Sequence, residues 1–245
     1  MNASSNDQCR LYADLAWTWR RMSPLEEYEQ EAEKLAQAIR QTSHRPVHTL
    51  LNLGCGGGHN DYWLKRQFDL TGIDLNEPML ELARELNPEV IYLTGDLRTI
   101  RLDKTFDAVV AADSLAYMLT GADLCATFTT AFVHLKPGGV FCTYVETTPE
   151  RFKQNATKSW TGDRGDDELV FIENSYDPDP ADSIYETTFV YLIRREGKLT
   201  VEVDPHVCGI FSLETWQALL QSVGFEVRTG GVMEDCPVLL GLKSD

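Results

Sequence analysis

The chain has 245 residues, of which 43% are hydrophobic and 24% charged, and it carries a net charge of −16. This length and composition fit one folded globular domain, or a domain with a modest insert. The negative charge repels a phosphate backbone and an anionic membrane surface, so we expect neither nucleic acid nor a membrane as a partner. No apolar run approaches the roughly 20 residues that span a bilayer. The polar start MNASSNDQCR lacks the apolar core of a signal peptide, so we expect a cytoplasmic protein.

Six cysteines are scattered along the chain without a C-x-x-C pair. Several lie inside apolar runs, where cysteine behaves as a small hydrophobic residue. We therefore expect reduced thiols, with neither a metal site nor a disulfide framework.

Helical and strand-like patterns alternate along the first part of the chain. Ser23-Pro24-Leu25-Glu26 has the pattern of a capping box with proline at the first helical position, which predicts a helix over residues 24–42. The hydrophobic pattern then predicts strands at 48–53, 70–74, 90–93, 106–111 and 140–145, and helices at 59–67, 77–86 and 122–135. Because almost continuously apolar strands alternate with helices, we expect a doubly wound α/β fold, in which helices cover both faces of a parallel sheet.

The pattern changes after Glu146. Residues 147–204 show strand-like alternation, which predicts an antiparallel β insert or lid before the last helix. Nine acids and one arginine between residues 163 and 186 give this stretch a charge of −8. The parallel-sheet pattern then returns with a helix at 213–223 and strands at 225–228 and 237–242.

A glycine-rich turn, LGCGGGH at residues 53–59, leads from the first strand into a helix. Glycine lets the backbone approach a ligand closely, and the start of a helix offers free N–H groups and a partial positive charge. We therefore expect a ligand with a negatively charged end at this turn.

The spacing of the glycines distinguishes between two kinds of ligand for this turn. A dinucleotide fingerprint, G-x-G-x-x-G, would need glycine where the chain has His59, whereas Gly54, Gly56 and Gly58 fit G-x-G-x-G. This disfavours an NAD-dependent dehydrogenase. Asp74 ends the next strand, 20 residues after Gly54 (74 − 54), where an acid accepts both hydroxyls of an adenosine ribose. We expect ribose binding there, because the alternative role of helix cap is better filled by the asparagine two residues on.

Five motifs in order make the chain resemble the class I S-adenosylmethionine-dependent methyltransferases. They are residues 54–58, Asp74, Thr94-Gly95-Asp96-Leu97, Phe106-Asp107-Ala108-Val109-Val110 and Leu135-Lys136-Pro137-Gly138-Gly139. The resemblance extends from Tyr12 to Leu242, and within the class it is to small-molecule methyltransferases, including amino-sugar N-methyltransferases. It implies a Rossmann-like methyltransferase sheet that binds S-adenosylmethionine, with S-adenosylhomocysteine as the product.

The resemblance also implies cofactor contacts. Asp96 would accept the adenine amino group with Leu97 beside the ring, and Ala112 or Asp113 would meet the methionine end. The expected cofactor-binding residues are Tyr12, Tyr28, Gly54, Cys55, Gly56, Gly58, Asp74, Leu75, Asp96, Leu97, Ala112 and Asp113.

An aromatic N-terminal segment completes the expected architecture. Tyr12, Trp17, Trp19 and Tyr28 are either a cover over the cofactor, because ring faces attract a sulfonium cation, or plain core aromatics. The predicted parts are an N-terminal segment over the cofactor site (1–22), the cofactor-binding α/β core (23–146), the insert as lid or dimer contact (147–204) and the end of the core (205–245).

Methyl transfer from a sulfonium requires alignment and the exclusion of water rather than a nucleophilic triad. A general base is needed only if the acceptor is protonated, as an amine is. Tyr117 and His206 are the expected catalytic residues, with Asp113 and Glu146 as further candidates for the base. A buried structural role is the alternative for His206.

The sequence therefore predicts a methyltransferase that acts on an N or O atom of a small metabolite. If the insert covers the pocket, its negative charge favours a cationic acceptor. A Rossmann-type NAD-dependent dehydrogenase and a non-catalytic S-adenosylmethionine-binding protein are the alternatives. A homodimer is expected if the insert is a subunit contact.

Overall fold

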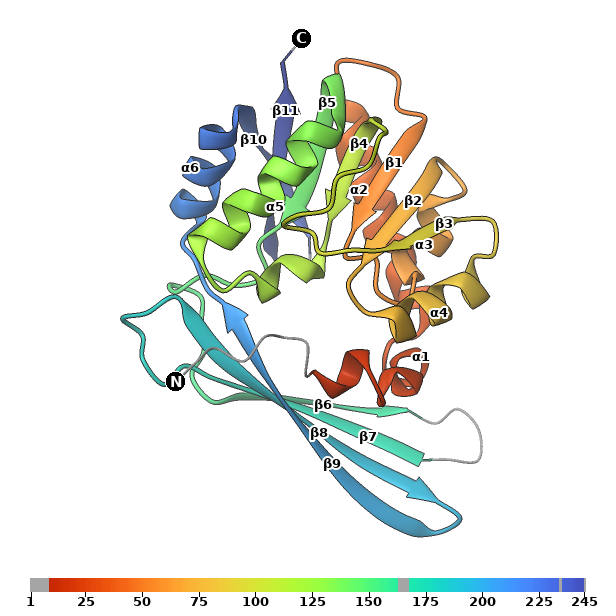
Figure 1. The fold of residues 1–245 in the computed structure, drawn as a ribbon. Coiled ribbons are helices and arrows are strands. Elements are labelled where there is room, and N and C mark those ends of the chain that lie inside the picture. Colours follow the sequence, from red (N-terminus) through yellow and green to blue (C-terminus); the bar gives the residue numbers. More distant parts are fainter. Residues whose placement is uncertain (1–8, 163–167, 234, 245) are drawn as a thin grey trace.

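The computed structural model describes residues 9–162, 168–233 and 235–244. Its larger sheet has seven strands in the order β10-β11-β5-β4-β1-β2-β3 (Figure 1). These strands are β1 (Thr49–Leu53), β2 (Asp69–Asp74), β3 (Ile91–Thr94), β4 (Phe106–Ala111), β5 (Leu135–Tyr144), β10 (Phe225–Met233) and β11 (Cys236–Lys243).

Strands β1 to β5 are parallel, and β11 runs antiparallel to both β5 and β10. The chain order reverses at β1, which lies between β2 and β4. Open α/β sheets bind ligands at such a switch point, in the crevice outside the carboxyl ends of the strands. The predicted doubly wound α/β sheet is confirmed, with an antiparallel edge.

Helices cover both faces of this sheet. Alternate residues of β4 face opposite sides: Ala108 and Val110 pack in one apolar cluster with α2, α3 and α4, while Val109 and Ala111 pack in another with α5 and α6. The helices are α1 (Trp19–Met22), α2 (Glu29–Thr42), α3 (His59–Leu64), α4 (Glu77–Leu86), α5 (Gly121–His134) and α6 (Leu213–Val223), and the 3-10 turns are η2 (Arg10–Tyr12), η3 (Ala16–Thr18), η4 (Leu25–Tyr28) and η5 (Asp113–Tyr117). Among the described residues, no helix is both long and apolar enough to cross a membrane.

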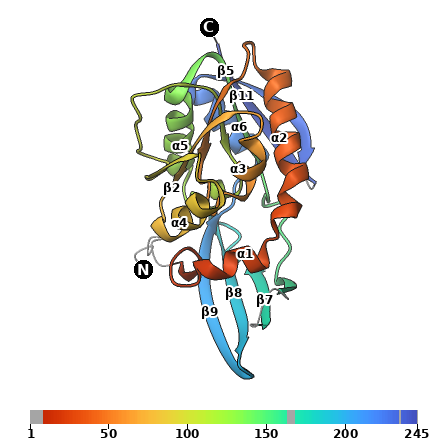
Figure 2. The same ribbon diagram turned by 90° about the vertical axis from the view of Figure 1, so that its right-hand side faces the viewer.

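The insert forms a separate antiparallel sheet in the order β6-β7-β8-β9. Its strands are β6 (Ala156–Gly162), β7 (Glu168–Tyr176), β8 (Ile184–Arg195) and β9 (Lys198–Gly209). This sheet lies beyond the carboxyl ends of the parallel strands, and the N-terminal segment, residues 10–22, runs between the two sheets (Figures 1 and 2). Leu11 and Leu15 of that segment pack against Leu169 and Tyr191 of the insert.

The helix predicted over 24–42 begins later than its sequence pattern indicates. Residues after Pro24 form the 3-10 turn η4, and the α-helix starts at Glu29 without a side-chain cap. The Ser23 hydroxyl bonds to the Tyr28 side chain instead, so the predicted capping box is wrong.

Other boundaries also differ. The helix predicted over 59–67 ends at Leu64, because the chain then turns toward β2, and β5 already begins at Leu135. Strand β9 continues to Gly209, so His206 belongs to the insert sheet rather than to the returning core. Part of the acidic stretch, residues 163–167, lies outside the described residues.

Candidate active site

The glycine-rich turn after β1 has three glycines with positive φ: Gly54 at 80°, Gly56 at 51° and Gly58 at 77°. A Cβ on Gly54 would lie 2.1 Å from the Cβ of Ser114, and one on Gly58 would lie 2.7 Å from Nδ2 of Asn87. These two glycines therefore permit close packing within the protein. A Cβ on Gly56 would meet only one methyl group, 3.6 Å away. Gly56 is the glycine that leaves open space for a ligand.

Asp74 holds this open part of the turn. Its carboxylate accepts the Gly56 N–H at 2.9 Å and the Asn76 N–H at 2.9 Å. Burial raises the pKa of Asp74, and these hydrogen bonds oppose the rise. Asn76 occupies the N-cap position of α4, but its side chain makes no capping bond. Asp74 is therefore placed beside the turn as expected, and its contact with a ribose stays a prediction.

Cys55 lies in the same turn but points elsewhere. Its side chain is buried in the apolar cluster that also holds Tyr92 and Ala83. Burial raises the pKa of the Cys55 thiol. Only the backbone of Cys55 is then positioned to contact a cofactor.

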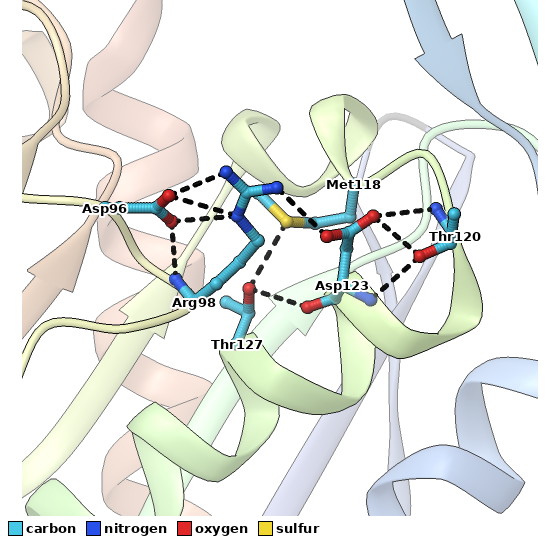
Figure 3. A network of polar contacts seen from close by, with 6 residues as sticks. All are labelled: Asp96, Arg98, Met118, Thr120, Asp123 and Thr127. Atoms are coloured by element: carbon cyan, nitrogen blue, oxygen red, sulfur yellow. Dashed lines mark hydrogen bonds and ion pairs between the residues drawn. The ribbon is translucent and has the colours of Figure 1, made fainter. Parts of the chain in front are cut away.

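Asp96, the residue expected to accept the adenine amino group, belongs to an ionic network (Figure 3). Both oxygens of Asp96 contact the Arg98 guanidinium, at 2.6 to 3.1 Å, and this bonding lowers the pKa of Asp96. Arg98 also bonds to Asp123, which forms the capping box of α5 with Thr120. An adenine amino group would therefore share the Asp96 carboxylate with Arg98.

The two leucines expected to bind the cofactor, Leu97 beside the adenine and Leu75, differ in exposure. Leu97 is buried in the core cluster beneath the turn, whereas Leu75 is 42% exposed. An exposed leucine next to Asp74 offers an apolar surface to a flat ring. Leu75 is thus better placed than Leu97 to lose water on binding.

The residues after β4 connect the turn with a cavity. Ala112 packs at the edge of the core, and Asp113 begins the 3-10 turn η5. The Ser114 hydroxyl donates to the Leu53 carbonyl at 2.9 Å, which fixes this turn against the end of β1. Asp113 then lines a cavity of about 530 Å³ that also reaches Tyr28.

This cavity lies between α2, the ends of β5 and β10, and the insert. Its walls carry five carboxylates, from Glu27, Glu31, Asp113, Glu146 and Glu173. They also carry three cations, from Arg151, Lys153 and Lys158. The cavity therefore has both signs of charge.

Glu146 is a cavity carboxylate with a raised pKa. Desolvation by the cavity walls raises this pKa, although the residue is exposed to solvent, and the charges of Asp113, Glu173 and Glu31 add to the rise, while Lys158 opposes it. A carboxyl group with a raised pKa is a better proton acceptor than an ordinary glutamate.

Tyr144 connects two of the cavity carboxylates. Its hydroxyl contacts Asp113 and lies 3.3 Å from Glu31. Burial raises the pKa of Tyr144, and the Asp113 charge adds to the rise. The phenol stays protonated and donates its single hydrogen to this acidic wall.

The expected catalytic pair lies in a hydrogen-bonded chain away from the cavity lining. The Tyr117 hydroxyl contacts Nδ1 of His206 at 2.9 Å and the Tyr12 hydroxyl at 2.6 Å. Nε2 of His206 contacts Asp204 at 2.8 Å, and the imidazole is buried. The structure thus brings Tyr12, Tyr117 and His206 together, with Asp204 as a partner.

The other aromatic residues of the expected cover lie in two different places. Trp19 donates its indole N–H to Nδ1 of His59 at 3.1 Å, and the Tyr28 ring lies 5.2 Å from the His59 ring. Burial lowers the pKa of His59 to about 4, so its ring is neutral and accepts this bond. Trp17 packs against the Arg195 guanidinium of the insert, 4.3 Å from the ring centre. Trp19 and Tyr28 therefore border the glycine-rich turn, whereas Trp17 contacts the insert.

Sequence reasoning did not find Tyr144, Glu31 or Asp204. Tyr144 sits at the carboxyl end of a predicted strand, which is a signal that could have found it. Glu31 and Asp204 have no such signal. Within the part of the chain that the structure describes, no group of three or more His, Cys, Asp or Glu residues could hold a metal ion.

Comparison with protein families matches residues 50–139 to a methyltransferase domain. The chain is 34% identical over 128 residues to a dTDP-3-amino-3,4,6-trideoxy-alpha-D-glucopyranose N,N-dimethyltransferase of Streptomyces venezuelae, covering 51% of this chain and 54% of that protein. This chain thus spans about half the length of that relative. It is 26% identical over 205 residues to a dTDP-3-amino-3,6-dideoxy-alpha-D-glucopyranose N,N-dimethyltransferase of Streptomyces fradiae, covering 82% of this chain and 79% of that protein.

Solved structures share the fold. The Streptomyces venezuelae protein DesVI superposes with a TM-score of 0.81 at 24% identity, covering 94% of this chain and 96% of that one. An S-adenosylmethionine-bound amino pentose methyltransferase from Micromonospora echinaspora gives a TM-score of 0.80 at 24% identity, with the same coverage. These comparisons do not support the dehydrogenase alternative or the non-catalytic one.

Proposed function

We propose that this chain, a class I S-adenosylmethionine-dependent methyltransferase, transfers the methyl group to an amine nitrogen of a small metabolite. The observation that carries the proposal is the cavity next to Asp113, with its five carboxylates. A protonated amine is attracted by such walls, because five carboxylates that line one cavity add their attraction for a cation. A neutral hydroxyl acceptor would gain nothing comparable from them.

Asp74, the backbone of Gly56 and the exposed face of Leu75 are the residues that would hold S-adenosylmethionine. The open backbone at Gly56 and the acid beside it fit a ligand with a ribose and a charged end. When bound, the cofactor supplies an already activated methyl group, so the chain itself has to align the acceptor and exclude water.

Glu146 is the residue that we assign as the proton acceptor. An ammonium group has no lone pair, so it must lose a proton before its nitrogen can attack. Glu146 lines the cavity and its pKa is raised, whereas Tyr117 and His206 do not border the cavity. Asp113, held by the Tyr144 hydroxyl, would accept a second N–H and orient the nitrogen.

The three cations of the cavity wall suit an acceptor that also carries a negative group. Arg151, Lys153 and Lys158 lie on or near the start of the insert and line the same cavity as the carboxylates. The relatives described above act on amino sugars linked to dTDP. We assign the acceptor as an amino sugar attached to a nucleoside diphosphate, with its phosphates toward these cations.

The test compares a dTDP-linked amino sugar with its hydroxyl analogue, by mass spectrometry of the methylated product. The proposal expects methylation of the amine alone, and Lys158→Ala should raise KM for the dTDP-linked sugar while changing KM little for the free amino sugar. Thermal stabilisation by S-adenosylhomocysteine, absent with NADH, checks the cofactor independently. Equal methylation of both analogues, or of neither, would contradict the assignment.

The insert has a second apolar face, and we assign it as a contact with another copy of this chain. The register of β7, β8 and β9 places aliphatic side chains together on the face away from the N-terminal segment: Val170, Ile172, Val190, Leu192, Leu199, Val201 and Val203. A sheet with one face in water normally has polar residues on that face. On β8 this face also carries Glu186 near one end and Arg194 near the other, so a two-fold rotation places opposite charges together.

Light scattering tests this contact. Wild-type protein should have the mass of a dimer, and Val201→Glu should reduce it toward a monomer. Val232→Glu is the matched control, because Val232 is also exposed, on β10, and lies outside this face. A monomeric wild type would contradict the assignment.

A further inference from the structure

Asp204 is a buried carboxylate that joins the insert to the N-terminal segment. Its side chain is 1% exposed. It accepts hydrogen bonds from the backbone N–H groups of Leu11 at 2.7 Å and Arg10 at 3.0 Å. It also contacts Nε2 of His206. These partners come from η2 and from β9, which are distant in the sequence.

The charge of Asp204 fixes the direction of the neighbouring hydrogen bonds. Burial by itself would raise the pKa of Asp204, but the bonds from His206 and the two amides outweigh it and lower that pKa. An ionised carboxylate only accepts, so Nε2 of His206 must donate. Nδ1 of His206 in turn contacts the Tyr117 hydroxyl, and that hydroxyl contacts the Tyr12 hydroxyl.

The far end of this chain, Tyr12, packs against the same cluster as Trp19, which borders the glycine-rich turn expected to bind the cofactor. Burial raises the pKa of Tyr12, and among the charges that add to the rise is the carboxylate of Asp74. Tyr12 is half-buried, and its ring packs edge-on against the Tyr117 ring at 5.5 Å. Its position therefore depends on both Tyr117 and the segment that Asp204 holds.

We propose that Asp204 is a positioning residue for methyl transfer: it fastens the N-terminal segment to the insert and, through His206 and Tyr117, sets the Tyr12 hydroxyl at the cofactor site. The proposal rests on the proposed function and on the expected place of Tyr12 beside the cofactor. Asp204 is buried away from solvent, so it would act by holding the N-terminal segment and His206 in place rather than by contact with substrate or cofactor.

An ion pair between the same two segments provides a matched control. Glu202, also on β9, contacts the Arg10 guanidinium at 2.7 Å near the surface. Glu202→Gln thus removes a carboxylate that joins the segments but leaves the buried chain intact. Exposed ion pairs contribute little to stability, so this variant should keep wild-type kinetics.

The first test is a double-mutant cycle with Asp204→Asn and Tyr12→Phe. Asparagine has an NH₂ group where Asp204 has a carboxylate oxygen, so at least one of its three donors (the two backbone N–H groups and His206) loses its acceptor. Because the N-terminal segment is then less firmly held, kcat should fall at least tenfold. If Asp204 acts through Tyr12, adding Tyr12→Phe should cause little further loss, because coupled residues are not additive. Wild-type kinetics in Asp204→Asn, or losses that multiply fully in the double variant, would overturn the proposal.

The second test does not use activity. Limited trypsin digestion should cleave after Arg10 several-fold faster in Asp204→Asn than in wild type or Glu202→Gln, since the segment is no longer fastened. This readout separates failure of the positioning role from failure of the proposed function, because it requires neither cofactor nor acceptor. Unchanged cleavage would overturn the fastening role.

Should Asp204→Asn not fold, His206→Gln serves in the same cycle with Tyr12→Phe, because it interrupts the chain while the carboxylate keeps both amide bonds. The same non-additive loss of kcat is expected. Full additivity there would overturn the proposal.

Discussion

The two ends of strand β4 place carboxylates in opposite surroundings. Asp107, near its start, is buried and contacts Arg45 and Lys136, each at 2.9 Å. Asp113, just past its end, lies in a cavity wall with Glu146 and three other carboxylates. At one end the contacts of the acid are with cations, whereas at the other the acid shares a cavity wall with four further carboxylates as well as three cations.

The hydrogen bonds sharpen this contrast. Asp107 also accepts the backbone N–H groups of His48 and Thr49, so it joins β4 to β1. Burial works against its charge, but the bonds from Lys136 and these amides outweigh it and lower the pKa of Asp107. The pKa of Glu146 is raised instead. The carboxylate at the start of β4 therefore stabilises the fold, whereas those of the cavity past its end favour the binding of protons and cations.

The largest expected effect belongs to Glu146→Gln. Loss of a general base costs between 10² and 10⁴ in rate, so kcat/KM for an amine acceptor should fall on the order of 10³-fold. Steady-state kinetics across pH checks this, and the wild-type rate should rise with pH as Glu146 ionises. Glu150→Gln, an exposed neighbour, is the control. An unchanged pH profile in Glu146→Gln would remove Glu146 from the mechanism.

The same variant makes a prediction about stability. Because the folded-state pKa of Glu146 is raised, its favourable contribution is complete below the unfolded pKa and is lost as pH rises through the folded pKa. At pH 8 Glu146→Gln should therefore unfold at a higher temperature than wild type. A lower melting temperature at pH 8 would contradict the raised pKa.

Asp107→Asn should change stability with the opposite sign and the opposite pH dependence. Losing the charge of a buried, paired carboxylate should cost about 2 to 4 kcal/mol of unfolding free energy, with kcat unchanged. Because the folded-state pKa is lowered, the difference from wild type should be complete above the unfolded pKa of about 3.9 and shrink as pH falls below it. Denaturant unfolding at several pH values measures this. A variant as stable as wild type at pH 7 would contradict the structural role.

Asp74→Ala should have a smaller effect, on ligand binding. Loss of the charge-assisted bonds to a ribose should weaken S-adenosylhomocysteine binding by about 1 to 3 kcal/mol, measured by calorimetry. Asp69→Ala, at the other end of β2, is the control. Normal affinity in Asp74→Ala would mean that the ribose is held elsewhere.

Arg98→Ala should have the smallest effect. It releases the Asp96 carboxylate from an exposed ion pair, which contributes about 0 to 1 kcal/mol to stability. The affinity for S-adenosylhomocysteine should stay the same or rise slightly, as the adenine no longer shares Asp96. A tenfold loss of affinity would show that Arg98 itself contacts the ligand.

The fold and the location of the candidate site were predictable from the sequence because the signals are local. The glycine-rich turn, Asp74 and the alternation of the insert each lie within a few residues of the element that they define. Glu146 and Asp113 were among the expected bases because they follow β5 and β4. The acid in the Phe106-Asp107 motif, by contrast, has a structural role that its place in the motif does not reveal.

The remaining features depend on contacts that no local pattern records. Arg10 and Asp204 are 194 positions apart, and the register of β9 decides that Asp204 and His206 face the N-terminal segment. Such contacts arise only when the insert and the core pack together. The start of α2 was predicted too early for a local reason, because the Ser23 hydroxyl bonds to the Tyr28 side chain instead of capping the helix.

One measurement tests the central contrast directly: a pH titration of ¹³C-labelled side-chain carboxyl groups by NMR, in wild type, Asp107→Asn and Glu146→Gln. The signal that disappears in Asp107→Asn should report a pKa below that of an ordinary aspartate. The signal that disappears in Glu146→Gln should report a pKa well above that of an ordinary glutamate. Asp113→Asn should in turn lower the pKa of Glu146, because one of the like charges is gone. An ordinary pKa for Glu146, insensitive to Asp113, would contradict the account.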